Sequence, residues 1–244
     1  LGTNVIGSGD DNDTMTFSGG TNTLDAGSGN DSVTLTGGVN YIAMGEGDDK
    51  VIASGGASNI DIRSLDGGDG SDELEVISTG TVTLPAFVNF ETVKITDTVH
   101  QSLNFSLSAS LSGIILNAGT TIDGSTITTT LGAGQSLTID GITDGDTSAA
   151  SVADGGIVIA QDAALTTLDL SLDDVGPATS ITNENVFIDI AGTGVTTANV
   201  TSGNDSFVVL SNSGNSLTSL ELFGTGSMAL GTLPTSVTNI NGTA

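Results

Sequence analysis

The chain has 244 residues, of which 29 are acidic and only 3 are basic, so its formal net charge is −26 at pH 7. Such a charge disfavours binding to nucleic acid and to anionic membrane surfaces. No run of 18 apolar residues is present to insert into a membrane. The chain contains no cysteine, which excludes disulfide bonds as a source of stability. We therefore expect neither nucleic acid nor membrane insertion among its interactions.

A glycine-rich turn occurs four times between positions 7 and 72, each time followed by alternating apolar and polar residues. The period-two alternation predicts a short β-strand after every turn. The closing aspartates of the four turns recur with a period of about 20 residues, which is typical of a stacked β-solenoid. The turns are Gly7-Ser8-Gly9-Asp10-Asp11, Gly27-Ser28-Gly29-Asn30-Asp31, Gly45-Glu46-Gly47-Asp48-Asp49 and Gly68-Asp69-Gly70-Ser71-Asp72.

A carboxylate at the same place in every coil would form a column of like charge. Such a column requires a cation, and a ligand set made only of oxygen atoms favours calcium. Without a cation, the self-repulsion of this acidic region predicts an expanded or disordered chain.

The fourth turn carries a resemblance to a known family. The segment Gly67-Gly68-Asp69-Gly70-Ser71-Asp72-Glu73-Leu74 fits the pattern G-G-x-G-x-D-x-U-x at every fixed position. Residues 7 to about 78 thus resemble the repeats-in-toxin (RTX) family, whose nonapeptides build a calcium-loaded parallel β-roll. Ordinary members repeat every nine residues and bind calcium on both sides of the roll, whereas this motif comes once per coil.

The resemblance implies that calcium (Ca2+) lies between successive turns, held by aspartate carboxylates and by carbonyl groups of the turns. The first copy is irregular, because Asn12 and Asp13 precede its apolar residues, so its acidic cluster is expected either to bind metal in a looser geometry or to be solvated. Carried over residue by residue, the expected metal ligands are Gly9, Asp11, Asp13, Gly27, Gly29, Asp31, Gly45, Gly47, Asp49, Gly68, Gly70 and Asp72.

A second set of turns separates the aspartate turns and contains Asn22, Asn40 and Asn59, which recur at nearly equal intervals along the chain. We interpret these residues as the opposite edge of each coil, with their amides stacked in a hydrogen-bonded ladder. The sequence therefore predicts a one-sided roll, with calcium along one edge and asparagine along the other.

Residues 79–244 lose the aspartate turns but keep short alternating strands, several of them spaced by about 20 residues. We predict an all-β fold, a right-handed parallel β-roll or β-helix (solenoid), with a calcium-binding roll over residues 1–78 and further solenoid coils over residues 79–244. An antiparallel β-sandwich is the alternative for the second part. We expect a loop near residues 140–154, where a further calcium ion is a second possibility beside plain solvation. The half-motif at Gly203-Asn204-Asp205 is interpreted as a plain turn.

The sequence offers little material for catalysis. A single histidine cannot form a zinc-protease motif such as H-E-x-x-H, and only one arginine and two lysines are present to bind an acidic substrate. A glycosidase-type carboxylate pair is not excluded by counting. The hypothesis that follows is that the protein is not an enzyme, and that Lys50 and Arg63 compensate local charge.

These features predict a calcium-stabilised, extracellular structural protein, secreted to the bacterial cell surface. The segments 87–95 and 216–222 resemble coils of surface-layer (S-layer) and large adhesin proteins. A surface-layer segment would associate with neighbouring copies of itself. The alternatives are a stalk or ligand-binding segment of a secreted RTX adhesin, or a folding module attached to an enzyme outside this sequence. Residues 126–130 suggest a threonine ladder that would bind ice or glycans. The chain begins in mid-repeat, from which we expect a fragment of a longer polypeptide.

Overall fold

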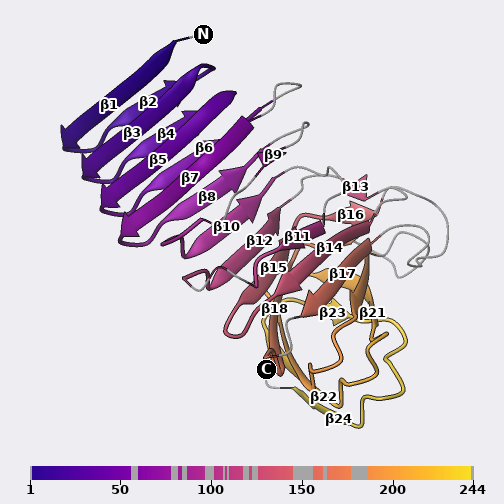
Figure 1. The fold of residues 1–244 in the computed structure, drawn as a ribbon. Helices are drawn as coiled ribbons and strands as arrows, with labels where there is room; N and C mark the ends of the chain where they lie inside the picture. Colours follow the sequence, from indigo (N-terminus) through magenta and orange to yellow (C-terminus); the bar gives the residue numbers. More distant parts are fainter. Residues whose placement is uncertain are drawn as a thin grey trace. The chain divides into compact units, whose positions relative to one another are not determined.

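The chain forms a parallel β-solenoid without helices among the residues that the structure describes (Figure 1). This computed structural model describes residues 2–55, 60–77, 82–83, 87–96, 102–106, 108, 110–117, 121–122, 126–144, 156–161, 164–176 and 186–242. No segment in these ranges is a helix of the length and hydropathy that crossing a bilayer requires. The chain divides into two compact units, Leu1–Val99 with Ser108–Ile114, and His100–Leu107 with Ile115–Ala244.

The first unit is built from long and short strands that alternate along the chain. The long strands pair side by side in one sheet, and the short strands pair in another (Figure 1). The long strands are β1 (Thr3–Asp10), β3 (Thr21–Ser28), β5 (Gly38–Glu46) and β7 (Ile60–Asp69), with the short β9 (Val82–Thr83) after them. The second sheet contains β2 (Thr14–Phe17), β4 (Ser32–Leu35), β6 (Lys50–Ala53), β8 (Glu73–Val76) and β10 (Thr92–Ile95).

The register of the long strands fixes the length of each coil. Ile6 pairs with Leu24, Leu24 with Ile42, and Ile42 with Leu65, so the first two coils are equal in length and the third is longer. The longest of the three coils includes a register shift after Asn40. Since matched coils superimpose like residues, the aspartate turns of the first unit stack directly on one another.

The core of the first unit is a thin layer of aliphatic side chains. Alternate residues of both sheets are buried, as the period-two pattern predicts. In the short strands, Val33, Val51, Leu74 and Val93 occupy successive positions of one column and are completely buried. Each such side chain contributes about 1.5–3 kcal/mol of burial free energy, so the stack itself holds the coils in register.

The second unit also consists of parallel coils. One sheet contains β11 (Ser102–Asn104), β14 (Thr126–Leu131), β17 (Gly156–Gln161), β19 (Val186–Ile190), β21 (Ser206–Ser211) and β23 (Met228–Ala229). Another contains β15 (Ser136–Asp140), β18 (Thr167–Asp173), β20 (Thr197–Ser202), β22 (Ser219–Gly224) and β24 (Asn239–Gly242). A short pair is formed by β13 (Thr121–Ile122) and β16 (Thr143–Asp144), and β12 (Gly113–Asn117) falls where the two units divide.

The parallel pairing of the second unit shows that the antiparallel sandwich alternative is wrong. Its coils are less uniform than the spacing in the sequence predicts. Leu137 pairs with Leu170, Leu170 with Val200, and Val200 with Leu222, so the first two of these coils are longer than the third and longer than the coils of the first unit. Residues 145–155, which make up most of the expected loop, lie outside the described residues.

Candidate metal centre

One glycine of each aspartate turn, the second glycine in the first turn and the first glycine in the other three, has a backbone conformation that only glycine adopts readily. Its φ is 107° at Gly9, 106° at Gly27, 109° at Gly45 and 102° at Gly68. A Cβ atom added at Gly45 would lie 1.9 Å from the carbonyl oxygen of Gly27 in the preceding coil, and the same contact recurs at Gly68 with Gly45. Glycine is therefore required for two reasons. Its positive φ is unfavourable for other residues, and the carbonyl oxygen of the preceding coil leaves no space for a Cβ atom.

The glycine two residues further along each of the later turns shows which residue of the first turn is structurally equivalent to it. Gly29, Gly47 and Gly70 have φ values of 126°, 129° and 140°, and Gly29 lies directly over the carbonyl group of Asp11. Asp11 thus occupies the glycine position of its coil, with a φ of 91°. Its alignment with the later closing aspartates is wrong, because the Gly-x-Gly-x-Asp string of the first turn begins at Gly7, two residues before Gly9, which is the residue that stacks on Gly27.

The residue in phase with the closing aspartates is Asp13. The backbone N–H of Asp13 donates to Oδ1 of Asp31 at 2.7 Å, and that of Asp31 donates to Oδ1 of Asp49 at 2.7 Å. The N–H of Asp49 donates in turn to Oδ1 of Asp72 at 2.8 Å. We call these four residues the aspartate column. The carboxylates of Asp31, Asp49 and Asp72 therefore each accept a hydrogen bond from the preceding coil.

The aspartate column leaves one oxygen of every carboxylate without a partner. Asp31, Asp49 and Asp72 are 2%, 2% and 1% exposed. The Oδ2 atoms of these residues and of Asp13 are buried and accept no hydrogen bond. Burying an unpartnered carboxylate oxygen is costly, so four equivalent atoms in one stack indicate that a positive species belongs beside them.

The electrostatics of the column point the same way. Burial raises the pKa of Asp72 to about 6, opposed by its hydrogen bond from Asp49 and reinforced by the charge of Asp49. Burial also raises the pKa of Asp49, with a smaller contribution from the negative charge of Asp31. Both shifts show that the ionised column is unfavourable by itself, and that either protons or a cation would stabilise it.

The donor set of the column fits a hard cation. Within the described residues, no three His, Cys, Asp or Glu side chains gather closely enough to hold a metal ion by themselves. A cation between coils would therefore need main-chain carbonyl oxygens and water in addition to carboxylates. Calcium accepts six to eight oxygen ligands of mixed kind, including backbone carbonyls. The glycine carbonyl groups directed from one coil to the next contain oxygen atoms of this kind.

A second column of side chains, next to the aspartates in the sequence, is not predicted by the Gly-x-Gly-x-Asp motif. The side-chain Oδ1 of Asn12 accepts from the backbone N–H of Asn30 at 2.8 Å, and Oδ1 of Asn30 accepts from that of Asp48 at 3.1 Å. Oδ1 of Asp48 accepts from Ser71 at 2.9 Å. These hydrogen bonds connect successive turns directly, without a metal ion between them. The sequence signal for this column is the Asn or Asp residue that directly precedes Asp13, Asp31 and Asp49.

The asparagine ladder is confirmed between Asn22 and Asn40, although these residues lie at the beginnings of the long strands and not in turns. Nδ2 of Asn4 donates to Oδ1 of Asn22 at 2.7 Å, and Nδ2 of Asn22 donates to Oδ1 of Asn40 at 2.8 Å. Asn22 and Asn40 are completely buried. The ladder continues no further, because Asn40 pairs with the apolar Ile62, and Asn59 lies outside the described residues.

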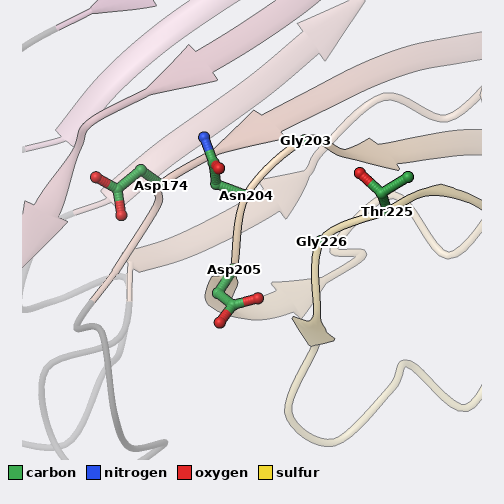
Figure 2. A pocket seen from close by; sticks show the side chains of 6 residues that line it. All are labelled: Asp174, Gly203, Asn204, Asp205, Thr225 and Gly226. Atoms are coloured by element: carbon green, nitrogen blue, oxygen red, sulfur yellow. The ribbon is translucent and has the colours of Figure 1, made fainter.

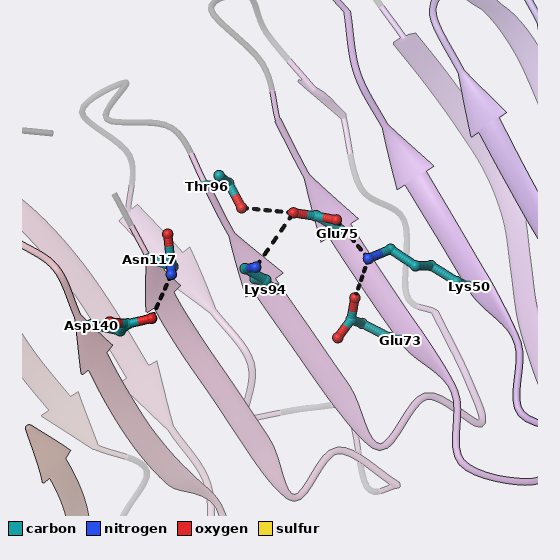
Figure 3. Close-up of polar contacts among 7 residues, drawn as sticks. All are labelled: Lys50, Glu73, Glu75, Lys94, Thr96, Asn117 and Asp140. Carbon is teal, nitrogen blue, oxygen red and sulfur yellow. Dashed lines mark hydrogen bonds and ion pairs between the residues drawn. The ribbon is translucent and has the colours of Figure 1, made fainter. Parts of the chain in front are cut away.

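The two lysines lie on β6 and β10, on either side of the glutamates of β8, on the outer face of the short-strand sheet (Figure 3). Nζ of Lys50 lies 2.7 Å from carboxylates of both Glu73 and Glu75, and Lys94 lies 3.7 Å from Glu75. Hydrogen bonding and charge from Lys50 lower the pKa of Glu75 despite its burial. These lysines compensate strand carboxylates rather than the aspartate turns, while Arg63 pairs with Asp61 on an exposed surface.

The half-motif at Gly203-Asn204-Asp205 lines a surface pocket of about 560 Å³ together with Asp174, Thr225 and Gly226 (Figure 2). The side chains of Asp174, Asn204 and Asp205 point in different directions in this view. The backbone N–H of Ser227 donates to Asp205 at 2.9 Å and lowers the pKa of that carboxyl. The arrangement agrees with the interpretation as a turn.

The threonine run of β14 does not form a ladder on its neighbour. Thr126, Thr128 and Thr130 pair in register with Gly156, Val158 and Ala160 of β17. A ligand face built from stacked threonine hydroxyls is therefore not present along these two strands.

Comparisons with known proteins found no matching family model, no similar curated protein and no similar solved structure. The resemblance to RTX repeats accordingly rests on the turn motifs and their stacking alone.

Proposed function

We propose that this protein is a structural β-solenoid whose first unit is stabilised by calcium, and that it works outside the cell as part of a surface layer. The observation that carries the proposal is the stack of four buried, unpartnered Oδ2 atoms in the aspartate column. Calcium between the coils would neutralise these atoms and use the carbonyl oxygens that the turns direct along the stack.

The extracellular location follows from affinity and composition. Sites with few carboxylates per ion belong to the weak class, with dissociation constants of about 10⁻⁴–10⁻³ M, which fill at the millimolar calcium concentrations found outside cells. A chain without cysteine has no disulfide bonds, and calcium takes over their stabilising role. The net charge of −26 supports the same conclusion, because divalent ions reduce self-repulsion and would bridge acidic faces of neighbouring copies.

Calcium-dependent melting tests the first part of the proposal. At about 10 mM calcium, a site of this class stabilises the fold by about 1.4–2.7 kcal/mol, which raises the melting temperature by several degrees. The double variant Asp31→Asn, Asp49→Asn should lose most of this increase. Asp25→Asn, Asp69→Asn removes the same charge from exposed positions and should retain it. A wild-type melting temperature that is identical in calcium and in excess chelator would refute the proposal.

Assembly tests the second part. A surface-layer segment should form two-dimensional lattices when calcium is added, visible by negative-stain electron microscopy. A protein that binds calcium but stays monomeric under these conditions would instead favour the adhesin alternative.

A further inference from the structure

The aspartate column does not stop at its last aspartate. The backbone N–H of Asp72 donates to Oε2 of Glu91 at 2.8 Å, which repeats the bond that links each earlier pair of coils. The strand register agrees, because Glu73 pairs with Thr92 and so places Asp72 opposite Glu91. A fifth carboxylate therefore follows the four aspartates, from a coil that lacks the Gly-x-Gly-x-Asp motif.

The backbone of the fifth coil explains why glutamate stands there. Glu91 and Thr92 both direct their N–H groups at the carbonyl oxygen of Asp72, at 3.2 and 3.1 Å, whereas in the earlier coils only the residue after the aspartate does so. The preceding Asn89 makes the turn with a φ of 57° instead of a glycine pair. In this different turn, the extra methylene of glutamate brings its carboxylate to the N–H of Asp72.

The next coil supplies no carboxylate. Ser112 follows Glu91 in the stack, and its N–H and Oγ bond to the carbonyl oxygen of Glu91 at 3.0 and 3.2 Å. Glu91 is therefore the last member of the column.

Two oxygen atoms, one from Asp72 and one from the fifth coil, lie close together beside Gly67. A Cβ atom added at Gly67 would lie 2.0 Å from the carbonyl oxygen of Asn89 and 2.6 Å from Oδ2 of Asp72. Only glycine fits here, and both oxygens therefore pack against its Cα atom, near one another. Oδ2 of Asp72 is buried without a hydrogen-bond partner, in a residue that is 1% exposed.

We propose that Glu91 completes a terminal divalent-cation site with the carboxylate of Asp72 and the main-chain carbonyl of Asn89. The inference rests on the proposed calcium function and adds one site that the four aspartate turns do not predict. It extends the calcium-dependent part of the fold to the fifth coil, because an ion here joins β8 and β10 through the turns that precede them.

Calcium stoichiometry of the full chain tests this site. Glu91→Gln keeps an oxygen that can accept from the N–H of Asp72 but removes the charge, and it should bind one calcium ion fewer per chain by equilibrium dialysis. Glu46→Gln makes the same change at an exposed turn position and should bind as many ions as the wild type. Glu91→Asp, which keeps the charge but shortens the side chain, should retain the stoichiometry with at least tenfold weaker binding of one ion.

The outcomes separate this inference from the proposed function. If Glu91→Gln binds as many ions as the wild type with unchanged affinities, the terminal site does not exist, while the aspartate column is unaffected. If the wild-type protein itself binds no calcium, both proposals fall together.

Discussion

The pKa of Asp72 leads to an unusual pH dependence of the calcium-free protein. The carboxyl has a pKa of about 6 in the fold against 3.8 for the exposed group, because burial disfavours its charge. The folded state therefore binds the proton more tightly than the unfolded state, so acidification stabilises it. From pH 7 to pH 5, Asp72 alone should add about 1 kcal/mol to the free energy of unfolding, or about 2–4 °C in melting temperature.

Thermal unfolding in excess chelator at pH 5 and pH 7 measures this effect. Because the high net charge also favours acid, the informative quantity is the difference between two variants. Asp72→Asn should lose about 1 kcal/mol of the pH dependence, whereas Asp69→Asn, exposed in the same turn, should keep it. With saturating calcium the sign should reverse, since protons then compete with the cation. Equal pH dependence in the two variants would refute the argument.

The remaining predictions concern the turns and the ladder. Asp11→Gly should raise the free energy of unfolding by about 1 kcal/mol, because it relieves a positive φ, and it should leave calcium stoichiometry unchanged; loss of an ion in dialysis would restore Asp11 as a ligand. Gly45→Ala should lower the free energy of unfolding by more than about 2 kcal/mol in urea, because its Cβ collides with the carbonyl of Gly27; a neutral effect would contradict the packing. Asn22→Ala should cost about 2–4 kcal/mol in the same assay, because buried Asn40 loses a partner, and a cost below about 0.5 kcal/mol would contradict the ladder.

The phase of the first turn shows where sequence comparison fails. Matching the motif letter by letter aligns Asp11 with Asp31, because both end a Gly-x-Gly-x-Asp string. The stack aligns Asp13 instead, since the hydrogen bond and the following strand register decide which residue faces the next coil. Position relative to the strand is therefore a better guide than position in the motif.

The sequence pattern accounts for the longer coils of the second unit only in part, because the loop expected near residues 140–154 falls between Leu137 and Leu170 but nothing comparable is expected between Leu170 and Val200. Alternating strands predict the strands themselves, but not how many residues lie outside the stack between one coil and the next. Leu137 and Leu170 are separated by more than the expected coil length and still pair, because parallel pairing requires only that apolar residues coincide on the buried face. Loops of any length can leave the coil without disturbing that match.

The sequence by itself determined the parallel stacking and the asparagine ladder of the first unit, because both follow from residues that recur at one coil length. Only the tertiary structure decided that the carboxylate column runs from Asp13 to Glu91. Glu91 stands in a turn without the motif, and it joins the column through the spatial register of β8 and β10. The physical reason is that a repeat motif specifies the local turn, whereas membership of a stack is specified by the backbone groups of the neighbouring coil.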